Sequence, residues 1–160
     1  MRLFGRAARS ECRVYFTGGV TALLMGWRES TVDIDLRFEP DSDELFRALP
    51  DIKERLHVNI EIASPPDFIP EVSGWEDRSQ FIQREGKVDF FHFDLYSQAL
   101  AKIERGHDKD IADVRSMLES GSIDRKKLSE LFLLIEPNLF RYPAINPSAF
   151  KNAVLGIVSD

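Results

Sequence analysis

The sequence predicts an α+β fold, a small mixed β-sheet with flanking helices followed by a helical C-terminal region. Two patterns along the chain predict it. Up to about residue 95, apolar side chains recur at every second residue in several short segments, which is the period of half-buried strands. From residue 96 onward the apolar period is helical. We therefore expect an α/β core over residues 1–95 and a helical region over residues 96–160, packed together as a single compact domain.

Strands and helices are expected to alternate in the first part of the chain. Expected strands cover residues 13–17, 31–36 and 57–62, and residues 82–95 form one or two more that turn near Glu85-Gly86-Lys87. Expected helices cover residues 20–25 and 43–49, with Asp43 as the N-cap of the second and Pro50 ending or restarting it. The sheet therefore has three to five strands.

The C-terminal region is expected to hold four helices, over residues 96–105, 110–119, 125–135 and 147–158. Their limits follow from stop and start residues: Gly121 after the second helix, Asp124 as the cap of the third, and Pro147 at the start of the fourth.

Composition excludes several classes of protein. A hydrophobic content of 43% and a charged content of 30% are ordinary for a globular protein and argue against disorder. The longest apolar run, Leu131–Ile135, is far shorter than the roughly 20 residues of a membrane span. A single cysteine, Cys12, excludes an internal disulfide and a Cys-rich zinc site. We therefore expect a cytoplasmic protein without a membrane partner.

Charge narrows the choice of partner. The net charge is −6, which does not suit binding to nucleic acid through bulk positive charge, although four arginines make the first thirteen residues basic. Residues 29–44 hold seven acids. Such a cluster forms either a solvated face or a metal site, and the spacing of the acids decides between them.

Gly18-Gly19 lies between an expected strand and an expected helix. Glycines at such a turn let the backbone approach a phosphate closely, and the following helix offers N–H groups and a positive dipole end. A glycine pair alone is more often only a turn, so phosphate binding needs support from other residues.

Asp33 and Asp35 supply that support on the next expected strand. Residues two apart on a strand face the same way, so both carboxylates leave one face of the sheet. Two like charges this close favour a cation between them, and Mg²⁺ prefers oxygen ligands, among them the phosphates of a substrate. The alternative for an isolated Asp-x-Asp pair is an exposed acidic strand.

Glu61 adds a third carboxylate, with Asn59 beside it on the polar side of the third expected strand. If that strand neighbours the strand of Asp33 and Asp35, the three acids suit a two-metal site for phosphoryl transfer. The alternative is again an exposed polar face.

Taken together, the glycine pair, the thirteen residues after it, the Asp-x-Asp strand and the later acid resemble the nucleotidyltransferase superfamily, the polymerase-β-like fold. Tyr15–Leu23 and Val32–Leu36 look like the first two motifs of the minimal nucleotidyltransferases of bacterial toxin–antitoxin and abortive-infection systems, the AbiEii and MenT type. The resemblance covers roughly residues 13–115.

Two helical segments extend the resemblance. Ala99–Arg105 looks like the lysine motif of these proteins, and Lys109–Val114 looks like their basic residue followed by Asp-x-x-Asp. The resemblance implies that Lys102 steadies a triphosphate and that Asp110 completes the active site. The alternative, which these two segments alone would favour, is that Lys102, Asp110 and their charged neighbours form surface ion pairs along the helices. The upstream motifs favour the active-site interpretation instead.

Four further residues have two readings each. His92 and Asp94 alternate on a Phe-rich strand and could face the same site, although a buried His beside an acid is more often structural. Trp27 and Trp75 could stack on a base, although packing in the core or at its rim is the commoner role.

The sequence thus predicts a Mg²⁺-dependent nucleotidyltransferase that moves NMP from an NTP such as ATP to a hydroxyl of RNA, such as tRNA, or of protein. Its predicted metal ligands are Asp33, Asp35 and Glu61, which are also catalytic, and its predicted nucleotide-binding residues are Gly18, Gly19, Thr21 and Lys102. The resemblance adds Lys102 and Asp110 to the catalytic residues. The toxin resemblance implies an antitoxin partner. One alternative is a non-catalytic nucleotide-binding or partner-regulating module with the same fold, and another is a metal-dependent hydrolase.

Overall fold

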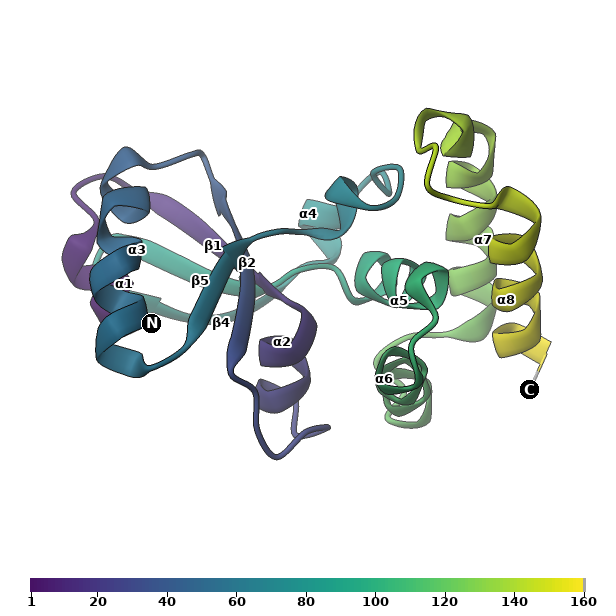
Figure 1. The fold of residues 1–160 in the computed structure, drawn as a ribbon, viewed down its shortest axis with the longest axis horizontal. Coiled ribbons are helices and arrows are strands. Elements are labelled where there is room, and N and C mark those ends of the chain that lie inside the picture. Colours follow the sequence, from purple (N-terminus) through teal and green to yellow (C-terminus); the bar gives the residue numbers. More distant parts are fainter. Residues whose placement is uncertain (160) are drawn as a thin grey trace. The chain divides into compact units, whose positions relative to one another are not determined.

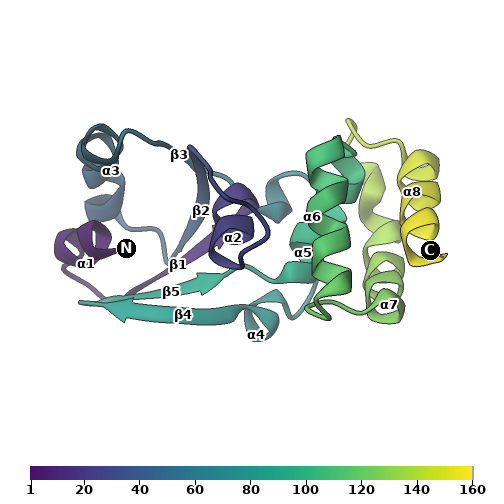
Figure 2. The ribbon, with the colours of Figure 1, turned by 90° about the horizontal axis from the view of Figure 1, so that it is seen from below.

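A five-stranded mixed sheet forms the centre of the first part of the chain in the computed structural model, which describes residues 1–159 (Figures 1 and 2). The strand order is β3-β2-β1-β5-β4. The pairs β1·β5 and β2·β3 are parallel, whereas β1·β2 and β4·β5 are antiparallel. The predicted α+β class with a mixed sheet is confirmed.

The sheet and its helices belong to one compact unit, Met1–Ser64 with Ser79–Phe93. Its strands are β1 (Cys12–Thr17), β2 (Asp33–Glu39), β3 (Asn59–Ile62), β4 (Gln80–Glu85) and β5 (Val88–His92). Its helices are α1 (Arg2–Ala7), α2 (Gly18–Leu24) and α3 (Asp43–Leu56).

Helix α3 differs from its prediction at both ends. It continues through Pro50 to Leu56, so the expectation that Pro50 ends or restarts a helix is wrong. Leu45 and Ile52, on either side of the proline, are both buried in the same core, and this shared packing outweighs the lost backbone hydrogen bond. The cap is Ser42, whose hydroxyl accepts from the Leu45 N–H, rather than Asp43.

Each face of the sheet has a different character. The alternate side chains of the strands pack into one core with α1 and α3, which lie on the same side of the sheet in Figure 2. That core includes Val14, Phe16, Leu36, Phe38 and Phe90. The opposite face carries Tyr15 stacked on Phe91, and the carboxylates of β2. Helices α1 and α3 therefore lie on the face of the sheet opposite to the one that carries these carboxylates.

A second compact unit combines Pro65–Arg78 with the chain from Asp94 onward. It contains the 3₁₀ helices η1 (Pro65–Asp67) and η2 (Glu136–Arg141) and the helices α4 (Trp75–Arg78), α5 (Leu95–Arg105), α6 (Asp108–Glu119), α7 (Arg125–Ile135) and α8 (Pro147–Ser159). The four predicted C-terminal helices are confirmed within two residues at each end. Among residues 1–159, no helix has the length and apolar character needed to cross a membrane.

Candidate active site

The glycine turn lies directly against the acidic strand because β1 and β2 are antiparallel. Thr17, the last residue of β1, pairs with Asp35, so the turn that follows Thr17 meets the Asp35 side chain. Gly18 has a φ of +65°, and a Cβ built on it would lie 2.6 Å from Asp35 Oδ2. Backbone conformation and lack of space therefore both require glycine at position 18.

Gly19 is glycine for a different reason. Its φ is not positive, so its conformation suits any residue. A Cβ there would, however, lie 2.6 Å from Thr31 Oγ1 and 3.3 Å from Arg28 Nη1. The side chains of Thr31 and Arg28 thus occupy the space above the second glycine. Sequence reasoning missed both residues, and the only signal was their position between the two motifs.

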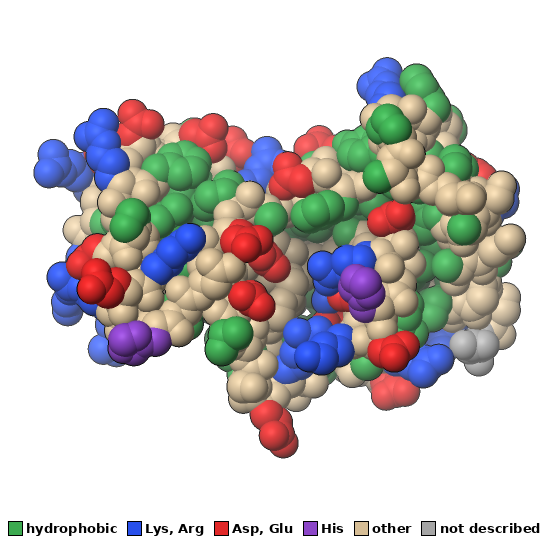
Figure 3. Space-filling view, in the orientation of Figure 1, with side chains coloured by type: hydrophobic (Ala, Val, Ile, Leu, Met, Phe, Trp, Pro, Cys, Tyr) green, Lys and Arg blue, Asp and Glu red, His purple; other side chains and the backbone are tan. Residues whose placement is uncertain are grey.

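The sheet brings the predicted carboxylates onto neighbouring strands of one face. Asp35 pairs with Glu61 and Asp33 with Asn59 in the parallel β2·β3 ladder, with paired residues about 4.8 Å apart at their backbones. Asp33 and Glu61 are exposed and Asp35 is half-buried. Acidic side chains are visible over β2 in the space-filling view (Figure 3).

These acids do not form a ready-made protein cage for a metal. Within residues 1–159, no three His, Cys, Asp or Glu side chains converge as a metal site. Asn59 Nδ2 donates to Glu61 Oε1 at 2.9 Å, which ties the Glu61 carboxylate to its own strand. Any cation at Asp33 and Asp35 would therefore take further ligands from a substrate or from water.

Thr21 lies beneath the turn rather than on its surface. Its side chain is fully buried, and its hydroxyl donates to the Phe16 carbonyl at 3.1 Å. With that proton engaged, Thr21 Oγ1 accepts from His92 Nδ1, 3.3 Å away, so the neutral imidazole carries its proton on Nδ1. Thr21 and His92 together fasten α2 to the sheet, and His92 has the structural role that the sequence favoured.

Protonation of His92 is expected to destabilise the fold below neutral pH. Burial lowers the pKa of His92 from its ordinary value of 6.5, so the unfolded chain binds this proton more readily than the folded protein does. Its contribution to the free energy of unfolding is therefore complete above pH 6.5 and is lost as the pH falls toward the folded-state pKa. The slope for one proton is at most about 1.4 kcal/mol per pH unit.

Urea unfolding at pH 7.5 and pH 5.5 measures this effect. In His92→Gln, whose amide can still donate to Thr21, we expect a smaller loss of stability between the two pH values than in the wild type. An equal loss of unfolding free energy between the two pH values in both proteins would contradict this role of His92.

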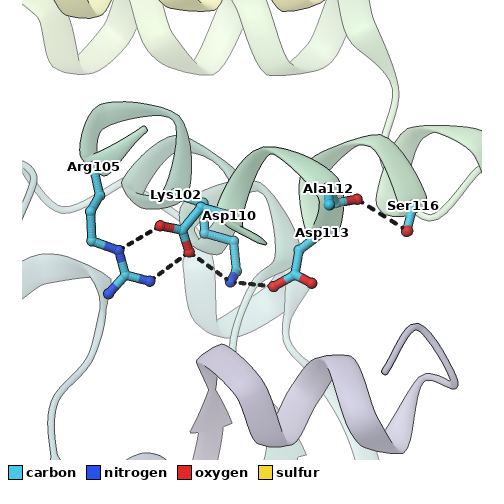
Figure 4. Close-up of polar contacts among 6 residues, drawn as sticks. All are labelled: Lys102, Arg105, Asp110, Ala112, Asp113 and Ser116. Atoms are coloured by element: carbon cyan, nitrogen blue, oxygen red, sulfur yellow. Dashed lines mark hydrogen bonds and ion pairs between the residues drawn. The ribbon is translucent and has the colours of Figure 1, made fainter. Parts of the chain in front are cut away.

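Lys102 and Asp110 meet in the second unit, in a network of four charges in which Lys102, Asp110 and Asp113 are buried and Arg105 is largely exposed (Figure 4). Lys102 Nζ lies 2.6 Å from Asp113 Oδ2 and 3.4 Å from Asp110 Oδ1, and Arg105 Nε donates to Asp110 Oδ2 at 2.7 Å. The side chains of Lys102, Asp110 and Asp113 are only 6%, 2% and 4% exposed. Interpreting them as surface ion pairs was therefore wrong.

The network sets the charge state of Asp110. Burial raises the pKa of its carboxyl, but hydrogen bonds from Arg105 and the charge of Lys102 outweigh burial and hold that pKa below its ordinary value of 3.8. Asp113, to which the Asp-x-x-Asp pattern assigned no role, makes the shorter contact with Lys102. The sequence had indicated it only by its spacing from Asp110.

Asp94 and Trp75 have structural roles in the second unit. Asp94 caps α5 by accepting from the N–H groups of Tyr96 and Ser97, and it pairs with Arg78 at 2.8 Å. Trp75 is 5% exposed, so its ring packs in the interior and offers no face to a base. Trp27, in the first unit, is half-buried.

Comparison with known proteins identifies the family. The model of a family described as a nucleotidyltransferase of unknown function (DUF6036) matches residues 2–152. The match spans nearly the whole chain, so the chain belongs to this family of nucleotidyltransferases. No curated protein and no solved structure matches it significantly.

Proposed function

We propose that this member of the nucleotidyltransferase family is a Mg²⁺-dependent enzyme that transfers NMP from an NTP to a hydroxyl group of RNA, such as tRNA, or of protein. The observation that carries the proposal is the close approach of the Gly18 backbone to the Asp35 carboxylate. A turn that suits phosphate and a carboxylate that suits a cation lie side by side, as a metal–triphosphate substrate requires.

The donor set fits Mg²⁺. Asp33 and Asp35 offer carboxylate oxygens on one face of β2, and Glu61 stands opposite Asp35 on β3. Mg²⁺ usually takes one or two protein carboxylates and completes its shell with water and substrate phosphates, so a third converging protein ligand is unnecessary. When bound, the ion would supply positive charge to the α-phosphate and to the departing pyrophosphate.

The chain's own groups would position the reactants. Backbone N–H groups of Gly18 and Gly19 donate to the β- and γ-phosphates, and Glu61 is the candidate base that takes the proton of the acceptor hydroxyl. The acceptor oxygen forms a bond to the α-phosphorus while the bond to the β-phosphate oxygen breaks, and pyrophosphate leaves with that electron pair. Thr21 is assigned a supporting role, because its hydroxyl is already engaged below the turn.

The helical motifs enter the proposal through resemblance. It assigns Lys102 to the triphosphate and Asp110 to completion of the site, and it favours a toxin whose acceptor is RNA and whose partner is an antitoxin. The buried ion pairs of Lys102 give this residue a structural role as well.

Transfer of label tests the proposal. The purified protein is incubated with α-labelled ATP, CTP, GTP or UTP, Mg²⁺, and total RNA or total protein. We expect label in one macromolecular fraction, which identifies the acceptor class, and no transfer when EDTA removes the metal. Release of labelled NMP without an acceptor would favour the hydrolase, and NTP binding without turnover would favour the non-catalytic module.

A further inference from the structure

We propose that Arg28 binds the terminal phosphates of the nucleotide and makes the site select triphosphates over monophosphates. The proposal rests on the proposed function and adds a residue and a specificity to it. Four observations carry it: the path of the chain after α2, the space above Gly19, the chemistry of the guanidinium, and the charges around it.

The chain after α2 directs Arg28 back toward the glycine turn. The N–H groups of Trp27 and Arg28 both donate to the Ala22 carbonyl, at 2.8 and 3.2 Å, so the backbone folds back on the end of the helix. From there the Arg28 side chain returns along α2 to its first turn, where Nη1 lies 3.3 Å from the Cβ position of Gly19. Arg28 is half-buried, which limits the conformations of its long side chain.

The lack of a side chain at Gly19 lets this guanidinium lie beside the peptide backbone of the turn. Because Gly19 has no conformational need to be glycine, its role is to leave room there for the Arg28 guanidinium and the Thr31 hydroxyl. Thr31 borders the same space and is held by its hydroxyl, which donates to the Asp33 carbonyl at 2.9 Å. A phosphate that approaches the backbone of the turn would therefore meet the Arg28 donors as well.

Arg28 lies in an acidic segment, so a polyanion is favoured here only when Asp33 and Asp35 hold a cation. Arg28 is the sole cationic residue between Gly18 and Leu36, a segment that also holds Glu29, Asp33 and Asp35. A cation held by Asp33 and Asp35 offsets only part of the charge of a triphosphate. Guanidinium binds phosphate oxygens through two parallel hydrogen bonds, which a lysine ammonium does not reproduce.

Nucleotide affinities of Arg28 variants test the inference. Dissociation constants are measured by calorimetry with Mg²⁺ for ATP, ADP and AMP, and for the corresponding cytidine, guanosine and uridine nucleotides. We expect Arg28→Gln to weaken NTP binding about 10- to 100-fold and to leave NMP binding unchanged, because charge-assisted hydrogen bonds are lost only with the terminal phosphates. Arg28→Lys should lose less, and Arg47→Gln, an exposed arginine on α3, should lose nothing.

A second variant displaces the Arg28 guanidinium from the backbone of the turn without changing Arg28 itself. Gly19→Ala places a methyl group where Arg28 and Thr31 now lie, so it should reproduce the NTP-selective loss, and thermal unfolding checks that each variant is folded. Weak NTP binding in Gly19→Ala but not in Arg28→Gln would overturn the inference, as would equal losses for NTP and NMP.

Failure of the inference is distinguishable from failure of the proposed function. If the wild type transfers label and Arg28→Gln binds NTP as the wild type does, the inference alone is wrong. If the folded wild type neither binds an NTP nor transfers label, both are wrong.

Discussion

Replacing Asp35 by asparagine is expected to abolish nucleotidyl transfer, by about 1,000-fold or more in rate, which corresponds to about 4 kcal/mol of transition-state stabilisation. The change removes one negative charge and alters the side-chain volume little. Asp35 is the carboxylate that touches the glycine turn, so its loss weakens the cation at the point where the phosphates would bind. The fold should persist, since Asp35 is half-buried and outside the apolar core.

The measurement compares initial rates of label transfer in the wild type, Asp35→Asn and Asp33→Asn. Asp51→Asn is the matched control, because Asp51 is an exposed acid on α3 whose partner is the exposed Arg55. We expect full activity in this control and a wild-type circular dichroism spectrum in all four proteins. An active Asp35→Asn enzyme would remove the metal-site argument, and with it the proposed mechanism.

Replacing Lys102 by methionine is expected to have the largest effect on stability, a loss of about 3–5 kcal/mol. Methionine fills most of the volume of lysine but removes the charge that faces two buried carboxylates. Asp110 keeps Arg105, whereas Asp113 loses the 2.6 Å contact with Lys102 Nζ. Taking one partner out of a buried ion pair leaves a charge that the interior solvates poorly.

A double-mutant cycle identifies what the lysine contributes. Adding Asp113→Leu to Lys102→Met converts the ion pair to two apolar side chains, and we expect most of the lost free energy of unfolding to return. Lys126→Met, at the exposed start of α7, is the control and should leave stability unchanged. Urea unfolding gives the four free energies. Additive losses would show that Lys102 and Asp113 are not energetically coupled.

The same variants separate structure from catalysis. Restored stability with restored transfer would make Lys102 a structural residue alone. Restored stability without transfer would support the role at the triphosphate that the motif resemblance implies.

Periodicity was sufficient to predict most of the fold, because it reports which face of an element is buried. The helical spacing after residue 96 predicted α5 to α8, and alternation predicted the strands. Helix α1 was not predicted, because its sequence is short and basic and because only Phe4 of that helix is buried. The continuation of α3 through Pro50 was not predicted either, since it depends on the burial of Leu45 and Ile52, which the local sequence does not indicate.

The candidate site was predictable where chemistry lies in consecutive residues. Gly18-Gly19 and Asp33-Ile34-Asp35 are recognisable as patterns, and alternation predicted the polar face of each strand. The pairing of Asp35 with Glu61 was only a condition in the sequence analysis, because alternation does not show which strands are neighbours. The sequence did not predict Arg28 as a site residue, because its position beside Gly19 depends on the turn that reverses the chain after α2. The burial of Thr21 was not predicted, because a threonine at the start of a helix gives the same sequence pattern whether it faces a ligand or the core.

The family model supports nucleotidyl transfer as the general activity. The narrower likeness to AbiEii and MenT toxins rests on the motifs alone and receives no support from the comparisons. The acceptor and the biological role must therefore be identified by the labelling experiment, because membership of the family does not identify them.

The structure restricts the two glycines of the turn unequally. Position 18 is restricted twice over, by backbone conformation and by the carboxylate of Asp35, and no single compensating change elsewhere relieves both. Position 19 is restricted only by its neighbours, so a smaller residue at position 31 together with a shifted Arg28 makes room for alanine or serine. Among relatives, we therefore expect an invariant first glycine and a second position that varies together with residues 28 and 31.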